Sequence, residues 1–207
     1  MTSIPLFIVA CVLLIILPGP DTAIVTKNTI VDGRKSGFKT MIGSCAGLMI
    51  HTIACVAGLS ALIVKSAVAF TILKYIGAIY LCYLGVRTLM ALRVKKSQVQ
   101  EEQLVEAKGN SSFKQGFITN ITNPKVAVFF LTFLPQFLAP NSEPFWAFLA
   151  MGIIYAVLTF VWFVFYVYLL NSIRSFMKRP STQAITEILT GSVLIGFGIK
   201  LAFEKGQ

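Results

Sequence analysis

Asp21 and Lys125 are the two ionisable residues that lie deepest within apolar stretches of this 207-residue sequence. A charge at membrane depth is costly unless it is paired or hydrated, so such residues usually face a cavity or each other. The two opposite charges predict a clamp for a zwitterion, in which Asp21 takes an ammonium group and Lys125 a carboxylate. Asp21 could also accept a coupling proton. The alternatives are a structural ion pair, or an Asp21 that simply favours a helix N-terminus.

Each of these charges follows a proline that interrupts an apolar stretch, in Gly19-Pro20-Asp21 and in Asn123-Pro124-Lys125. Proline removes an amide donor and clashes with the carbonyl four residues back, so it frees polar backbone groups. Inside a membrane, protein, water or a ligand must satisfy these groups. The half-helix after each break also presents a positive end that suits a carboxylate. One proline alone is more simply a kink, but the pair favours a binding site.

Three further polar side chains lie in the apolar stretches. Asn120 and Asn123 could cap the second broken helix or bind substrate. His51 is the only histidine, and it shares a helix face with Gly43 and Gly47, a stripe of small residues where another helix can pack closely. His51 could relay protons, because histidine titrates near neutral pH. A hydrogen-bonded packing role for His51 is the favoured interpretation.

The elements that must position these residues are membrane-spanning helices. Hydrophobic residues make up 56% of the chain and charged residues only 13%, whereas a soluble domain carries about 25% charge. This composition excludes a soluble globular enzyme, a disordered chain and a coiled coil. Stretches long enough to cross the roughly 30 Å of a bilayer core are expected to be helical. They are Ile4–Thr26, Phe38–Val64, Ala67–Leu92, Phe117–Ala139, Phe145–Leu170 and Ala184–Phe203.

The basic residues predict an orientation in the membrane. The net charge is +10, and Lys and Arg gather in the first, third and fifth connections, whereas Pro140–Pro144 has none. Basic connections stay in the cytoplasm, so both termini are expected to face outward. Aromatic residues do not interleave with the basic ones as a single-strand binding face requires. Nucleic acid is therefore not an expected partner.

The two halves of the chain resemble each other weakly. The first repeat covers about 1–92 and the second about 116–207, with a cytoplasmic linker at about 93–115. Each half has a proline break and a later glycine followed by a basic residue, in Leu84-Gly85-Val86-Arg87 and Phe197-Gly198-Ile199-Lys200. Three spans per half would invert one half relative to the other, as in many transporters. The predicted fold is an all-α integral membrane protein of about six transmembrane helices, in two inverted three-helix repeats with helices 1 and 4 broken at prolines.

Sequence patterns for other chemistry are not found. Cys11, Cys45, Cys55 and Cys82 form no C-x-x-C pair and no cluster with metal-ligand spacing. The sequence has no P-loop, no dinucleotide fingerprint and no spacing that singles out a hydrolytic triad. We therefore expect no metal, no cofactor and no enzymatic activity, and an energy source in ions or the membrane potential.

Several motifs occur in an order and spacing that together are specific. They are Leu17-Pro18-Gly19-Pro20-Asp21-Thr22, Asp32-Gly33-Arg34-Lys35-Ser36-Gly37-Phe38, the Gly43, Gly47 and His51 stripe, Gly77-Ala78-x-Tyr80-Leu81-x-Tyr83-Leu84-Gly85-x-Arg87, Phe113-x-x-Gly116, Asn123-Pro124-Lys125 and Phe133-Leu134-Pro135-Gln136-Phe137. Through them, nearly the whole chain resembles the lysine-exporter and homoserine/threonine-resistance (LysE/RhtB) superfamily of bacterial amino-acid exporters.

The resemblance implies a multi-pass protein of the bacterial inner membrane that exports amino acids or close derivatives, such as homoserine, threonine, leucine or lysine. It also implies that the proton gradient drives export, and that Asn is accepted at the position of Asp21. The residues expected to bind or translocate substrate lie at the two breaks, with Asp21 and His51 as candidates for a proton relay. They are Pro18, Gly19, Pro20, Asp21, Asn120, Asn123, Pro124 and Lys125.

Two other functions remain open from the sequence. A cation exporter would need ligands, and one histidine with few intramembrane carboxylates makes a poor site for a divalent metal. A membrane scaffold or assembly protein would explain the hydrophobicity but not two matched broken helices beside opposite charges. The expected partners are an amino-acid substrate, protons and the lipid bilayer. A homodimer is compatible with the small-residue stripe, which serves equally well for packing within one chain.

Overall fold

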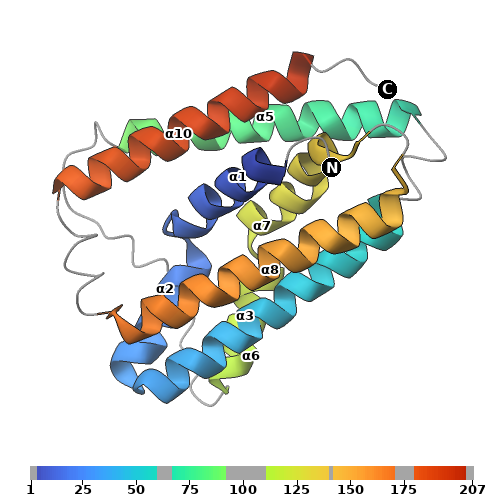
Figure 1. The fold of residues 1–207 in the computed structure, drawn as a ribbon. Helices are drawn as coiled ribbons and strands as arrows, with labels where there is room; N and C mark the ends of the chain where they lie inside the picture. The colour runs from blue at the N-terminus through green and yellow to red at the C-terminus, as the bar shows by residue number, and fades with distance from the viewer. Residues whose placement is uncertain (1–3, 60–66, 92–110, 140–141, 171–179, 204–207) are drawn as a thin grey trace.

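The computed structural model describes residues 4–59, 67–91, 111–139, 142–170 and 180–203, and these ranges contain helices and no strand (Figure 1). The α-helices are α1 (Ile4–Ile16), α2 (Pro20–Val31), α3 (Arg34–Ala54), α5 (Ala67–Ala91), α6 (Ser112–Ile121), α7 (Pro124–Val128), α8 (Pro144–Tyr168) and α10 (Pro180–Phe203). Helix α3 continues into a π-helical turn, η1 (Cys55–Leu59). Helix α7 continues through a second π-helical turn, η2 (Phe129–Phe133), and a 3₁₀ turn, η3 (Leu134–Phe137).

Length and composition identify a membrane protein. Among the described residues, Arg34–Gly58 and Pro144–Tyr168 are each long and apolar enough to cross a bilayer. Two bent helix pairs pass the same test, which gives up to four spans if each pair counts as one. The other two predicted stretches correspond to α5, of 25 residues, and to α10, of 24 residues, which begins at Pro180 rather than Ala184. The all-helical class is thus confirmed.

Both helices predicted to break at prolines do break. Helices α1 and α2 meet at an angle of 51°, and α6 meets the segment that begins at Pro124 at 47°. Pro20 and Pro124 each lie in the first turn of the helix after the break, where the missing amide has no intrahelical partner to lose. Each of these two prolines therefore starts the second half-helix of its broken pair.

Some helix ends differ from the predicted spans because local capping extends the helix beyond the apolar residues. Helix α3 begins at Arg34 rather than Phe38, after Gly33 in a left-handed conformation at φ 84°. Helix α6 begins at Ser112 rather than Phe117, because the Ser111 hydroxyl accepts a hydrogen bond from the Lys114 amide at 3.3 Å. Most of the predicted linker at 93–115 lies outside the described residues.

The helices form a bundle in which the broken ones are central. Figure 1 shows α5 and α10 side by side at one edge, α3 and α8 at the opposite edge, and α1 and α7 between them. Helix α3 packs against α2, α6 and α8. The breaks therefore lie inside the bundle, where protein must satisfy their backbone groups.

The interior differs in character on the two sides of the breaks. On the side of α1, η2 and η3, buried phenylalanines dominate, including Phe7, Phe130 and Phe137. On the side of α2, α3 and α6, most of the buried polar residues lie beside a smaller apolar cluster. The Asn28 amide there donates to the Thr40 hydroxyl at 2.8 Å and to the Gln115 side-chain oxygen at 3.2 Å. The breaks therefore separate an aromatic layer from a layer in which buried polar residues are concentrated, here called the polar layer.

Candidate functional site

Lys125 caps the broken end of α1. Its Nζ donates to the Leu14 carbonyl at 3.0 Å and to the Leu17 carbonyl at 3.1 Å. The Leu14 carbonyl lacks its helical partner because Pro18, four residues on, has no amide proton. The cation also lies at the negative end of α1, where a positive charge is stabilised. Among the described residues, these two carbonyls are the hydrogen-bond acceptors that Nζ contacts. Because an ammonium group has three N–H donors, one donor remains for another partner.

At the second break, side chains likewise form hydrogen bonds with the freed backbone groups of α6 and α7. The Asn123 side-chain oxygen caps α7 by accepting from the Lys125 amide at 3.0 Å. At the end of α6, the Asn120 carbonyl accepts from the Asn123 amide at 3.0 Å and lies 3.2 Å from His51 Nε2. The His51 ring stacks on Phe130, with 5.7 Å between ring centroids. His51 thus closes the end of α6 as Lys125 closes the end of α1.

Asp21 lies in the first turn of α2, and its carboxylate is held by two amides. Asn120 Nδ2 donates to one carboxylate oxygen at 3.1 Å, and Asn123 Nδ2 donates to the other. In the described part of the chain, Asp21 and Lys125 form no direct salt bridge with each other. Both charges are held by neutral groups, and each keeps capacity for a charged ligand.

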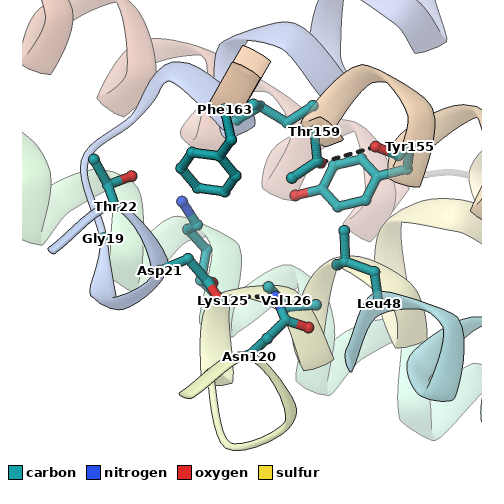
Figure 2. Close-up of a pocket in the computed structure, with 11 residues that line it drawn as sticks. Gly19, Asp21, Thr22, Leu48, Asn120, Lys125, Val126, Tyr155, Thr159 and Phe163 are labelled. Carbon is teal, nitrogen blue, oxygen red and sulfur yellow. Dashed lines mark hydrogen bonds between the residues drawn. The ribbon is translucent and has the colours of Figure 1, made fainter. Parts of the chain in front are cut away.

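A pocket opens where the half-helix ends of the two breaks meet (Figure 2). Asp21, Asn120 and Lys125 contribute its polar lining, while Ile15 and Val126 contribute apolar lining. The cavity measures about 20 Å³, which is room for one or two water molecules and too little for a free amino acid. A larger ligand would need the walls to move apart.

Of the predicted residues, Gly19, Asp21, Asn120 and Lys125 line the pocket. The other predicted residues lie at or near the two breaks but do not line the pocket. Pro20 and Pro124 start the second half-helices, Asn123 holds Asp21, Pro18 is exposed in the first break, and His51 contacts the Asn120 carbonyl.

Sequence reasoning missed one wall of the pocket. Helix α8 contributes Tyr155, Thr159 and Phe163, all of them buried. Their spacing of four residues places them on one face of the helix. Aromatic residues occur throughout this helix, so their spacing did not mark this face in the sequence.

Metal chemistry gains no support from the geometry. The described ranges contain no group of three or more His, Cys, Asp or Glu side chains that could hold an ion. All four cysteines are free thiols, with Cys11 and Cys55 buried. The arrangement of groups suits an organic zwitterion better than a metal ion, because it offers one anion, one cation and apolar walls.

Comparisons with known proteins agree with this membrane architecture. The family model described as LysE type translocator matches residues 12–205. An uncharacterized membrane protein, YrhP of Bacillus subtilis (strain 168), is 35% identical over 206 residues, covering 97% of this chain and 98% of the relative. The leucine efflux protein of Klebsiella pneumoniae is 29% identical and that of Salmonella typhimurium 28%, each covering 95% of this chain and 92% of the relative. No solved structure matches.

Proposed function

The chain belongs to the LysE type translocator family, and on this premise we propose that it exports amino acids through the pocket between its two broken helices. The observation that carries the proposal is the pair of opposite charges at this pocket, Asp21 and Lys125, each held by neutral groups. Two relatives are named leucine efflux proteins, so leucine is the first substrate to test. The family is one of transporters, and we propose no enzymatic activity.

The site recognises the backbone of an amino acid through its charges. Asp21 takes the ammonium group, and the third N–H donor of Lys125 takes the carboxylate. Ile15, Leu48 and Val126 offer apolar contact to a side chain. Since the cavity is smaller than an amino acid, substrate entry separates the pocket walls, and the small cavity corresponds to a closed conformation.

Six spans in two inverted repeats provide the framework for this movement. The support is that the two bent pairs take the first position of each half, and that α3 packs on α8 and α5 on α10, which are equivalent helices of the two halves. The repeats cover about 1–92 and 116–207, joined by a cytoplasmic linker at 93–115. Rocking of one repeat against the other would expose the pocket to either side in turn.

We place the protein in the bacterial inner membrane with both termini outward. Exposed Arg34, Lys35 and Lys39 at the start of α3 support this orientation. The polar layer then faces the cytoplasm and the aromatic layer faces outward. We propose that the proton gradient drives export, and Asp21 and His51 are the two candidates for the proton relay, because the Asn120 amide contacts Asp21 and the Asn120 carbonyl contacts His51. The oligomeric state, homodimer included, is not part of the proposal.

Efflux profiling tests the function directly. Cells that lack their own exporters, loaded with mixed dipeptides and expressing this protein, should release one or a few amino acids, leucine among them. The measurement is the amount of every amino acid in the medium over time. Release should stop when an uncoupler collapses the proton gradient, because no nucleotide-binding motif supplies another energy source.

The same cells, with metal ions in the medium measured as well, separate the rival functions. An unchanged profile from protein verified in the membrane would contradict amino-acid export. Release of metal ions instead would favour a cation exporter. No release of either would favour a scaffold.

Replacing Asp21 with asparagine should slow leucine efflux by no more than about tenfold. The Asn side-chain oxygen can still accept a hydrogen bond from the substrate ammonium group, so the change replaces a charged acceptor with a neutral one, at a cost of about 0.5–1.5 kcal/mol. The measurement is the leucine efflux rate of each variant, normalised to the amount of the protein in the membrane. The matched control is Asp32→Asn, which changes an exposed acid after α2. Complete loss with normal protein levels would instead give Asp21 an indispensable role as proton acceptor.

A further inference from the structure

Tyr155 brings an unused hydrogen-bond donor into the pocket. The residue is only 3% exposed and lines the cavity from α8. Its backbone carbonyl accepts from the Thr159 hydroxyl at 2.8 Å, but among the described residues none forms a hydrogen bond with its phenolic hydroxyl. Buried tyrosine hydroxyls usually have a partner. Figure 2 shows this hydroxyl directed into the pocket from one side and the Lys125 ammonium from the other.

The position of this hydroxyl is fixed by aromatic packing. The Tyr155 ring stacks on Phe129 with 4.4 Å between centroids and meets Phe130 edge-on at 5.8 Å. Phe129 in turn stacks on Phe133 at 5.1 Å. These three phenylalanines are all at most 2% exposed. Because the ring has little freedom to turn, its hydroxyl is preorganised to meet a ligand in the pocket.

Two donors that have no hydrogen-bond partner among the described residues thus point into one space, the third N–H of Lys125 and the Tyr155 hydroxyl. A carboxylate has two oxygens and accepts from both donors, whereas an ammonium group cannot accept from either. Asp21 occupies the acceptor role at the same pocket. We propose that Tyr155 is a specificity-determining residue whose hydroxyl, together with Lys125, binds the carboxylate of the substrate. This assignment rests on the proposed export function.

The test uses the purified full-length protein in liposomes and counterflow of radiolabelled leucine, which needs no proton gradient. The comparison compound is 3-methylbutylamine, which is leucine without its carboxylate. If efflux profiling identifies another amino acid, that amino acid replaces leucine, and its own decarboxylated amine replaces 3-methylbutylamine. In Tyr155→Phe, the ring packing stays but the donor is lost. The KM for leucine should rise about tenfold, as expected for one hydrogen bond to a charged group. Inhibition by 3-methylbutylamine, which has no carboxylate, should be unchanged.

The controls separate the possible outcomes. Tyr168→Phe, on the exposed face of the same helix, should behave like the unmodified protein, and melting temperatures should show that all variants are folded. An unchanged KM in Tyr155→Phe, or equal weakening of leucine and amine binding, would overturn the role of Tyr155 while export stands. Unmodified protein that exchanges no amino acid would overturn export, and the assignment of Tyr155 with it.

Discussion

Replacing Lys125 with methionine should abolish leucine export, with the rate falling at least about 100-fold. The substitution keeps an unbranched side chain of similar length but removes the charge that we propose binds the substrate carboxylate. Removing one charged partner from a buried site costs about 3–5 kcal/mol, which corresponds to more than a hundredfold change in rate or affinity. No other residue that lines the pocket carries a positive charge, so no described side chain can take its place.

The same substitution should also destabilise the first broken helix. The Leu14 and Leu17 carbonyls would both lose the ammonium donor, at about 1–3 kcal/mol for each acceptor that finds no new partner. The melting temperature in detergent measures this part of the effect. Lys125→Arg should restore stability, because a guanidinium group also donates to both carbonyls. It should export less well than lysine, because it changes the shape of the site.

Lys114 provides the matched control. It is an exposed lysine on α6, and among the described residues its contact is a backbone one to Ser111. Lys114→Met should therefore export leucine normally at normal protein levels. Normal export by Lys125→Met would remove the pocket from the translocation pathway.

The sequence predicted the elements of this site more reliably than their contacts. Apolar length alone indicated the helices, and the positions of Pro20 and Pro124 indicated both breaks, because proline acts on the backbone locally. The capping role of Asn123 was likewise one of the two predicted alternatives. These features depend on a few neighbouring residues, so a single sequence suffices to see them.

Contacts between distant helices could not be predicted in the same way. In a membrane protein, the faces toward lipid and toward other helices are both apolar, so periodicity does not reveal that α8 turns Tyr155 and Phe163 toward the pocket. Nor does the sequence say that Lys125 reaches back to the end of α1. That contact arises because Pro18 leaves the Leu14 carbonyl without a helical partner, and the nearest cation satisfies it.

A second large effect is expected where α3 and α6 touch. A methyl group added at Gly43 would lie 2.0 Å from the Phe113 carbonyl oxygen, and one added at Gly116 would lie 2.0 Å from the Thr40 carbonyl oxygen. These neighbours are backbone atoms, which cannot rotate away as a side chain can. Carbon and oxygen atoms need about 3.3 Å or more even in a close contact. The two helices must therefore separate in either alanine variant.

Separation of α3 from α6 would damage the site as well as the fold. Helix α6 carries Asn120, which holds Asp21, and α3 carries His51, which contacts the Asn120 carbonyl. We expect Gly43→Ala and Gly116→Ala each to be destabilised by at least about 1–3 kcal/mol, the usual range for overpacking. Melting temperature, folded yield in detergent and leucine counterflow should fall together.

Gly196 is the control that separates this contact from a general effect of glycine replacement. It lies within α10, where an added methyl group meets no atom within 4 Å. Alanine is favoured over glycine in a helix by about 1 kcal/mol, so Gly196→Ala should be neutral or slightly stabilising and should export normally. If Gly43→Ala were as stable and as active as Gly196→Ala, the tight α3–α6 contact could not be what holds Asn120 against Asp21. The binding groups at the breaks would then have to be positioned by α2 and α8 alone.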